Sequence, residues 1–159
     1  MLEFTEALFE DGLGLRLIAS PEGLRGVEFL PARMPAGSRN DSHPVLVEAV
    51  RQLRAYFAGE LRQFQLPLDM RGTDFQLRVW HRLESIPYAQ TRSYAEIAAS
   101  IGSPRAVRAV GAANGANPVA IVVPCHRVIG SGGKLVGYGG GLGLKKKLLE
   151  LERFHAVLV

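Results

Sequence analysis

The chain has 159 residues, of which 47% are hydrophobic and 21% charged, and its formal net charge is +4 at neutral pH. A chain of this length can bury about 70% of the surface that it exposes when unfolded, so its core needs no disulfide or metal. Its single cysteine, Cys125, excludes an internal disulfide and a cysteine-rich metal site, and we expect neither a metal nor a cofactor. No apolar run approaches the roughly 18 residues of a membrane span, and the acidic N-terminus lacks the basic segment of a signal peptide. We therefore expect a cytoplasmic protein that makes no contact with a membrane.

The charge of the chain is divided unevenly along the sequence. Residues 1–72 carry 8 Arg against 10 Asp and Glu, a net charge of −2, whereas residues 73–159 carry 11 Lys and Arg against 5 Asp and Glu, a net charge of +6. No acidic residue lies between Glu96 and Glu150. Such a stretch suits a polyanion such as DNA, because carboxylates repel phosphates. A glycine-rich, apolar region with little room for any charge would give the same pattern, so the asymmetry favours nucleic acid only modestly.

The apolar pattern is interrupted by Pro67 and Gly72, which divide the chain. We predict an α+β protein, with a small N-terminal α/β scaffold domain over residues 1–70 and a mostly helical C-terminal domain over residues 73–159. The first part offers no residues suited to chemistry. In it we expect a helix over residues 43–58 and short strands over residues 15–19, 26–29 and 64–68.

The second part contains two helix-start signals of the same kind. Thr73 with Gln76, and Ser93 with Glu96, have the spacing of a capping box, in which the two side chains satisfy free N–H groups of the first helical turn. A helix is therefore expected after each pair. Trp80 falls on the apolar face of the first helix, and we expect it in the core.

A second helix is expected soon after the one that follows Ser93. Ser103 can cap this helix, Pro104 suits its first position, and Arg105 and Arg108 would then be neighbours on one face. Two helices joined by a short turn that contains glycine have the geometry of a helix-turn-helix unit. Many such pairs bind nothing, so this pattern alone leaves DNA binding open.

The one thiol of the chain follows a buried segment. Residues 119–123 are all apolar and predict a strand, and Cys125, His126 and Arg127 come directly after it and a proline. A free cysteine is usually a small buried apolar residue. An adjacent imidazole and a nearby cation favour the thiolate, which is the nucleophilic form, so a reactive cysteine is the alternative.

A glycine-rich loop and a final helix complete the chain. Glycines make up 8 of the 14 residues from 130 to 143, a content that predicts a loop able to bring backbone N–H groups close to a ligand. Residues 144–154 predict a helix. The three lysines at 145–147 are expected on its solvated face, with phosphate contact as the alternative.

Residues 123–128, with the sequence VPCHRV, resemble the active-site motif of the methylated-DNA–protein-cysteine methyltransferases, also called O6-alkylguanine-DNA alkyltransferases. The resemblance extends from about residue 45 to 153, with the elements in the family's order and spacing. This combination is highly specific, whereas PCHR alone would only suggest the family. The other matching segments are Tyr56-Phe57-Ala58-Gly59, Phe75-Gln76, Val79-Trp80, Ser93-Tyr94, Arg108-Ala109-Val110-Gly111, Asn117-Pro118, Gly137-Tyr138, Gly140-Gly141-Leu142, Leu148-Leu149 and Glu152.

The resemblance implies a DNA-repair enzyme whose partner is double-stranded DNA containing O6-alkylguanine, with O4-alkylthymine as a possible second substrate. Such an enzyme binds through the helix-turn-helix, flips the damaged base into a pocket and moves the alkyl group onto Cys125. The product is a thioether with no ready leaving group, and the chain has no second cysteine. We therefore predict one turnover per molecule, without a cofactor, by a monomer.

The resemblance also assigns roles to individual residues. His126, linked to Cys125 through water and oriented by Glu152, would remove the thiol proton. Tyr94 would stabilise the departing guanine and help to rotate the phosphate, and Arg108 would fill the place of the flipped base. The implied catalytic residues are Cys125, His126, Glu152, Tyr94 and Asn117, which would brace the turn around the cysteine; the DNA-binding residues are Arg105, Arg108 and Tyr94; and the base pocket is formed by Val128, Tyr138 and Gly139.

Two positions depart from the family pattern. Gly139 stands where many members have a serine, so only its backbone N–H can contact the guanine, and Ala89 stands where a turn glycine is usual. Two other functions remain as alternatives. The first is a hydrolase, because Cys125, His126 and Glu152 could form a catalytic triad. The second is a helix-turn-helix protein that binds alkylated DNA without repairing it, although such relatives replace the cysteine that this chain keeps.

Overall fold

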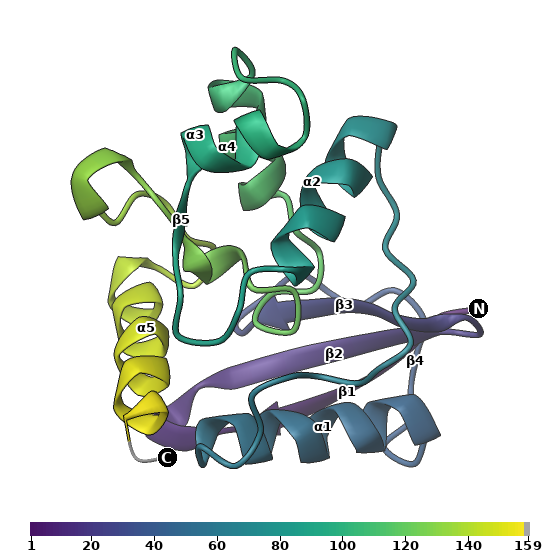
Figure 1. Cartoon of the computed structure of the whole chain (residues 1–159). Coiled ribbons are helices and arrows are strands. Elements are labelled where there is room, and N and C mark those ends of the chain that lie inside the picture. Colours follow the sequence, from purple (N-terminus) through teal and green to yellow (C-terminus); the bar gives the residue numbers. More distant parts are fainter. Residues whose placement is uncertain (158–159) are drawn as a thin grey trace. The chain divides into compact units, whose positions relative to one another are not determined.

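The computed structural model describes residues 1–157. The chain forms two compact units, Met1–Arg71 and Gly72–Val159 (Figure 1). The first unit is built around a sheet and the second mostly from helices, which confirms the predicted α+β class. Among the described residues, no helix combines the length and the apolar character that crossing a bilayer requires.

The first unit contains a four-stranded sheet in the order β3-β2-β1-β4. Strands β1, β2 and β3 form an antiparallel meander, and the short β4 lies parallel to β1. Helix α1 contacts the three long strands and buries Leu46, Leu53 and Tyr56 completely. The elements are β1 (Glu3–Leu8), the 3-10 turn η1 (Glu10–Gly12), β2 (Gly14–Ser20), β3 (Gly23–Phe29), β4 (Ser38–Arg39) and α1 (Pro44–Phe57).

Helix α1 begins and ends as its sequence predicts. Pro44 occupies the first helical position, and the Nδ1 atom of His43 accepts a hydrogen bond from the N–H of Val45 at 3.1 Å. The strands predicted over residues 15–19 and 26–29 are also present, within β2 and β3.

The strand predicted over residues 64–68 is wrong. Only Leu68 forms a bridge, with Leu24 of β3. The backbone of Gln65 instead pairs with the side chain of Gln52 in α1, through N–H and carbonyl contacts of 2.9 and 3.0 Å. A helix side chain thus takes the place that a neighbouring strand would have at Gln65. Beyond it, the segment pairs with β3 only around Leu24, whose N–H donates to the carbonyl of Pro67 and whose carbonyl accepts from the N–H of Asp69.

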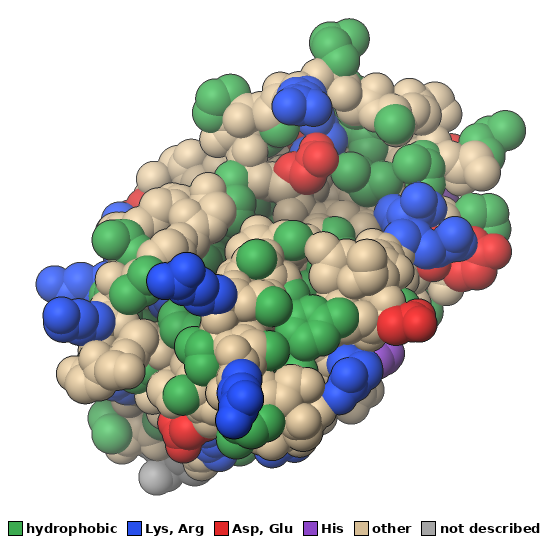
Figure 2. Space-filling view, turned by 90° about the horizontal axis from the view of Figure 1, so that it is seen from above, with side chains coloured by type: hydrophobic (Ala, Val, Ile, Leu, Met, Phe, Trp, Pro, Cys, Tyr) green, Lys and Arg blue, Asp and Glu red, His purple; other side chains and the backbone are tan. Residues whose placement is uncertain are grey.

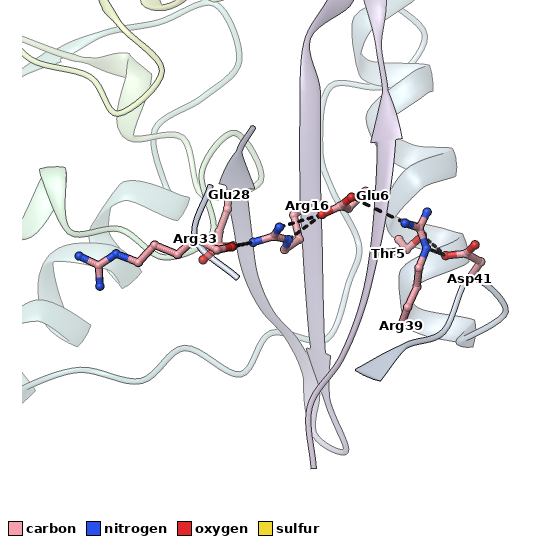
Figure 3. A network of polar contacts seen from close by, with 7 residues as sticks. All are labelled: Thr5, Glu6, Arg16, Glu28, Arg33, Arg39 and Asp41. Carbon is pink, nitrogen blue, oxygen red and sulfur yellow. Dashed lines mark hydrogen bonds and ion pairs between the residues drawn. The ribbon is translucent and has the colours of Figure 1, made fainter. Parts of the chain in front are cut away.

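A network of charged side chains crosses the sheet of the first unit (Figure 3). Arg16 on β2 lies directly opposite Glu6 on β1 and Glu28 on β3. Its guanidinium contacts their carboxylates at 2.8 and 3.1 Å and also donates to the carbonyl of Arg33. Arg39 extends the network from Glu6 to Asp41, which accepts from Thr5. Cross-strand pairs of this kind each contribute about 0.2–1 kcal/mol and fix the register of the strands.

The second unit contains three helices that pack together, α2, α3 and α4, and a C-terminal helix, α5. Helices α2, α3 and α4 contact one another, and α5 contacts the 3-10 turn η2. Strands β5 and β6 are short and parallel. The elements are α2 (Asp74–Glu84), β5 (Arg92–Ser93), α3 (Tyr94–Ser100), α4 (Val107–Gly115), η2 (Cys125–Arg127), β6 (Val128–Ile129), the 3-10 turn η3 (Ser131–Gly133) and α5 (Leu142–Ala156).

Both predicted capping boxes are present at the starts of α2 and α3. Thr73 and Gln76 exchange hydrogen bonds of 2.9 and 3.1 Å, and Ser93 and Glu96 exchange bonds of 2.8 and 3.0 Å. Trp80 is 2% exposed, and its indole N–H donates to the carbonyl of Ala113 in α4 at 2.8 Å. The tryptophan therefore joins α2 to α4 in the core, as expected.

The second helix of the pair starts later than predicted. Ser103 does not cap it: the N–H of Ala106 donates to the carbonyl of Ser103, which closes a turn, and α4 begins at Val107 without a side-chain cap. Pro104 suits the second position of such a turn as well as the first position of a helix. Arg105 therefore lies in the turn, and only Arg108 is in the helix.

The segment before the cysteine is buried but is not a strand. Val119, Ile121 and Val123 are almost completely buried, yet the N–H of Val123 donates back to the carbonyl of Val119 at 2.9 Å. Ile121 has φ +71°, a left-handed conformation that is unusual for a β-branched residue. The apolar run thus folds into a tight buried turn, which apolar content alone does not distinguish from a strand.

Candidate active site

Cys125 is the first residue of η2, directly after the tight turn and Pro124. Its N–H donates to the carbonyl of Val123 at 2.8 Å, and the residue is only 6% exposed. Its thiol is therefore held by a backbone that has little freedom to move.

Two asparagines brace the backbone on either side of this cysteine. The side-chain amide of Asn117 donates to the carbonyl of Val123 at 2.9 Å, while its oxygen accepts from the N–H of Val119 at 3.0 Å. The amide of Asn114, in α4, donates to the carbonyl of Cys125 at 3.3 Å. Asn114 was not predicted from the sequence, although an asparagine inside an Ala- and Gly-rich helix is a signal, because this residue is unfavourable there unless it has a partner.

A fully buried ion cluster lies behind the cysteine. The Nε2 atom of His126 is 2.7 Å from a carboxylate oxygen of Glu152, and both side chains are 0% exposed. The guanidinium of Arg127 also binds Glu152, through two contacts of 2.9 and 3.1 Å, and donates to the carbonyl of Ile86 at 2.8 Å. The backbone N–H of Ala89 adds a fourth donor to Glu152 at 3.1 Å. The carboxylate on α5 thus fixes the orientation of the histidine from outside the turn.

The surroundings of this cluster keep Glu152 ionised and His126 neutral. Burial is the largest influence on Glu152 and opposes its ionisation, but the hydrogen bonds and charges of His126 and Arg127 together hold the pKa of its carboxyl at about 2. Burial lowers the pKa of His126 below its ordinary value, and it outweighs the opposing effect of Glu152. At neutral pH a neutral imidazole therefore donates its Nε2 proton to a carboxylate.

This tautomer leaves the other nitrogen of His126 as a proton acceptor. The Nδ1 atom is buried and has no hydrogen-bond partner among the described residues. A neutral imidazole that donates from Nε2 has its lone pair on Nδ1. The cluster is therefore a base whose accepting atom is free of other protein groups.

Burial raises the pKa of the Cys125 thiol, and the side chain of Asn117 and then the charge of Lys145 oppose that rise. The cation whose charge acts on the thiol is thus Lys145, whereas the guanidinium of Arg127 is turned toward Glu152. Lys145 is also not on the solvated face predicted for it: it is 0% exposed. The missed signal is helical spacing, because Lys145 lies on the same face of α5 as Leu148, Leu149 and Glu152.

Two tyrosines also face this region. The hydroxyl of Tyr94, at the start of α3, donates to the carbonyl of Val136 at 2.9 Å. Burial, followed by the negative charge that Cys125 carries when ionised, raises the pKa of Tyr94. The same two causes, in the same order, raise the pKa of Tyr138 well above its ordinary value, and its ring lies edge-on to His126 at 6.5 Å. Both hydroxyls therefore remain protonated and can act as donors.

The other predicted site residues lie outside the buried cluster. Arg105 and Arg108 are exposed and have no hydrogen bond or ion pair within residues 1–157. Gly139 is exposed in the glycine-rich loop, whereas Val128 is buried and its N–H donates to the carbonyl of Cys125. On the face seen from above, Lys and Arg side chains are scattered among apolar, neutral and acidic side chains and do not form one continuous basic patch (Figure 2).

The described residues contain no group of three or more His, Cys, Asp or Glu side chains placed to hold a metal ion. The side-chain groups described around Cys125 are an imidazole, a carboxylate, a guanidinium, two phenols, two amides and an ammonium.

In comparisons with known proteins, both halves of the chain match domains of one family. Residues 74–154 match the family described as 6-O-methylguanine DNA methyltransferase, DNA binding domain, and residues 14–70 match its ribonuclease-like domain. A methylated-DNA–protein-cysteine methyltransferase of Mycolicibacterium paratuberculosis is 67% identical over 108 residues, which are 68% of this chain and 66% of the relative. Its counterpart in Methanosarcina acetivorans is 51% identical and covers 92% of this chain and 96% of the relative.

A solved structure gives the same result over almost the whole length. The crystal structure of Mycobacterium tuberculosis OGT in complex with DNA is 50% identical, covers 97% of this chain and 93% of the other, and has a TM-score of 0.85. The family resemblance is thus confirmed by sequence and by fold. The chain belongs to the methylated-DNA–protein-cysteine methyltransferase family.

Proposed function

We propose that this chain repairs DNA by moving the alkyl group from O6 of guanine to the sulfur of Cys125, once per molecule and without a cofactor. The observation that carries the proposal is the buried His126–Glu152 pair beside the single cysteine, with Nε2 of the histidine engaged and Nδ1 free to accept a proton. The family membership of the chain supports the same reaction.

In the first step, the base removes the thiol proton. His126 accepts the proton at Nδ1 through one intervening water, and Glu152 stabilises the imidazolium that forms. Arg127 has a balancing role, because it compensates the charge of Glu152 in the resting state and so keeps the histidine neutral. The pair thus gains one positive charge as the sulfur gains one negative charge, and the buried region stays balanced.

In the second step, the sulfur forms a bond to the alkyl carbon as the bond from that carbon to O6 breaks. The electron pair of the broken bond remains on the guanine, which needs hydrogen-bond donors at its oxygen and ring nitrogen to become a good leaving group. Tyr94, once its hydroxyl is released from the carbonyl of Val136, and the backbone N–H of Gly139 are the donors that we assign to the guanine. We assign Tyr138 and Val128 to the walls of the guanine pocket. Because the N–H of Val128 already donates to the carbonyl of Cys125, the carbonyl of Val128 is the backbone group that can contact the guanine.

The DNA contact is assigned to the start of α4 and the turn before it. Arg105 and Arg108 are exposed side chains without protein partners among the described residues, so binding phosphate or filling a base stack breaks no existing interaction. We propose double-stranded DNA as the partner, and a monomer acting in the cytoplasm as the working form, because the site is assembled from one chain and a free thiol persists in a reducing compartment.

The test is to incubate the chain with excess DNA containing O6-methylguanine and to follow its mass. We expect a gain of about 14 Da, one methylene, on the peptide that contains Cys125, and a plateau at one methyl group per chain. The Cys125→Ser variant should bind the same DNA, with an affinity that falls as salt rises, and gain no mass. Continued turnover, or hydrolysis of thiol-reactive esters without DNA, would instead indicate a hydrolase. An unmodified wild-type chain that still binds the DNA would indicate a protein that recognises damage without repairing it.

A further inference from the structure

A buried amide near the end of α4 has more hydrogen-bonding capacity than the backbone around it uses. Asn114 is 5% exposed and donates to the carbonyl of Cys125 at 3.3 Å, which is long for a hydrogen bond between an amide and a carbonyl. Its Oδ1 atom is also buried and has no hydrogen-bond partner among residues 1–157. A buried polar atom without a partner destabilises a fold, so one long contact with the cysteine backbone does not account for this residue.

The same amide also acts on Tyr94. Burial and the charge of the ionised Cys125 raise the pKa of Tyr94, and a side-chain hydrogen bond with Asn114 opposes this rise. Only a donor to the phenol oxygen stabilises its anion, so the amide N–H makes this contact, in agreement with the unpaired Oδ1 atom. Gly111 lies on the same face of α4, three residues earlier, and a Cβ atom placed on it would be 4.0 Å from the Tyr94 ring. This face of α4 thus follows the tyrosine side chain.

These contacts form a short chain of hydrogen bonds. Tyr94 accepts from Asn114 and donates to the carbonyl of Val136 at 2.9 Å. That carbonyl also accepts from Lys145 at 3.0 Å, so it keeps a donor when the tyrosine turns away from it. A hydroxyl that accepts a hydrogen bond becomes a stronger donor in the bond that it makes itself. The acceptor of Tyr94 can therefore change while the group that donates to Tyr94 stays in place.

Taking the alkyl transfer proposed above as given, we propose that Asn114 is a positioning residue that acts through Tyr94. Its amide N–H holds the phenol oxygen while the hydroxyl proton turns from the carbonyl of Val136 to the departing guanine. The amide thereby orients and strengthens this donor as the electron pair of the broken bond comes to rest on the guanine. This role explains why a buried asparagine occupies a helix that is otherwise rich in alanine and glycine.

The first test compares two reactions of Cys125 that differ in their leaving group. Methyl transfer from O6-methylguanine DNA releases a guanine that needs a hydrogen-bond donor, whereas alkylation by iodoacetamide releases iodide, which needs none. Asn114→Leu should slow single-turnover methyl transfer about tenfold at saturating DNA, and it should change the rate of alkylation, followed by mass, less than about twofold. Asn114→Gln keeps an amide donor and should recover part of the loss.

The matched control is an asparagine of the first unit. Asn40→Leu removes an amide that donates to Glu3 at 3.0 Å, and it should change neither rate per folded molecule. Equal slowing of both reactions by Asn114→Leu would show that Asn114 only braces the backbone of Cys125, and an unchanged methyl transfer would show that it has no role in the reaction. Either result would overturn the proposal. Should the leucine variant fail to fold, Asn114→Ala removes the same donor with a smaller side chain, and the same outcomes apply.

The second test asks whether Asn114 acts through the hydroxyl of Tyr94. Tyr94→Phe removes that hydroxyl and should slow methyl transfer more than Asn114→Leu does. Adding Asn114→Leu to Tyr94→Phe should then lower the rate by less than about a further twofold, because the amide has lost the group on which it acts. Two effects that multiply in the double variant would contradict the proposal. A wild-type chain that reacts with iodoacetamide but transfers no methyl group from DNA would refute the repair reaction itself, whereas equal transfer by the wild type and Asn114→Leu would refute only the role of the asparagine.

Discussion

The two units of the chain use charged side chains in opposite ways. In the first unit, Arg16 is buried, but its partners Glu6 and Glu28 have side chains that are 28% and 45% exposed, so water can replace the arginine if it is lost. In the second unit, His126 and Glu152 are both 0% exposed, and no water can compensate a missing partner easily. We infer from this contrast that the sheet network stabilises the strand register, whereas the buried cluster maintains specific protonation states at an energetic cost that a purely structural site would avoid.

The largest effect is expected where the buried cluster loses its carboxylate. Glu152→Gln leaves Arg127 without a counter-charge and removes the group that stabilises the imidazolium, so we expect the rate of alkyl transfer to fall about 100- to 1,000-fold and the free energy of unfolding to fall by about 3 kcal/mol. Single-turnover transfer and urea denaturation measure the two effects.

The matched control for this change lies on the same helix. Glu150→Gln removes a carboxylate whose side chain is 59% exposed and which contacts Lys146 at 3.8 Å. It should change neither rate nor stability measurably. Equal losses in the two variants would show that the cluster is no different from a surface pair.

The second prediction concerns the stability of the two units as the pH is lowered. His126 has a pKa below its ordinary value of 6.5, so on acidification the unfolded chain takes up the proton first and stability is lost as the pH falls below 6.5. Glu152, with a pKa of about 2, contributes stability that is present above its ordinary value of 4.5 and is lost as the pH falls from there toward 2. In the first unit, Asp69 has a pKa lowered mainly by its hydrogen bond from Arg71, and its contribution is lost only below its ordinary value of 3.8. The second unit should therefore be weakened first.

The single tryptophan makes this order measurable. Trp80 lies in the second unit and is 2% exposed, so its fluorescence reports that unit, whereas far-ultraviolet circular dichroism reports both. In a fixed low concentration of urea, we expect the fluorescence change to precede the dichroism change as the pH is lowered. His126→Gln should remove the part of the pH dependence that lies above about pH 5. Coincident transitions, or a variant with the wild-type slope, would contradict this account.

Much of the fold follows from local signals in the sequence. The capping boxes at Thr73 and Ser93 and the helix start at Pro44 were predictable, because each depends on residues within one helical turn. The sequence does not show that residues 64–68 form no strand, because the side chain that pairs with the backbone of Gln65 comes from Gln52 in another element. Pro104 is ambiguous for another reason, since proline suits both a turn and the start of a helix.

In the candidate site, too, the features set by neighbouring residues could be predicted, whereas those set by residues distant along the chain could not. The motif around Cys125 is local and points to a reactive thiol, and the histidine beside it is visible in the sequence. The direction of the Arg127 side chain is not visible in the sequence. Although Arg127 lies close to Cys125 along the chain, its guanidinium faces the carboxylate of Glu152 on α5. Lys145 was hidden among three consecutive lysines, which suggest a solvated face, although its spacing from Leu148 and Glu152 places it inward.

A smaller effect is expected in the sheet of the first unit. Arg16→Met removes two ion pairs and a hydrogen bond to the carbonyl of Arg33, but the exposed carboxylates can be rehydrated, so the free energy of unfolding should fall by about 1 kcal/mol. The rate of alkyl transfer per folded molecule should not change. Arg39→Met, at the half-exposed end of the network, serves as the control and should cost less. A loss for Arg16→Met as large as that for Glu152→Gln would remove the distinction between the two networks.

The smallest effect is expected at a strained residue that supports the buried cluster. Ala89 has φ +64°, a left-handed conformation that glycine adopts without strain, and its N–H donates to Glu152 at 3.1 Å. Ala89→Gly keeps this donor and relieves the strain, so the free energy of unfolding should rise by about 0.5 kcal/mol with no change in transfer rate. Asp11 has φ +60° in the first unit and is the matched control. Aspartate tolerates the left-handed region better than alanine, so Asp11→Gly should gain less. A lower transfer rate for Ala89→Gly would show that the stiffness of this turn, and not only its N–H, helps to hold Glu152 in place against His126.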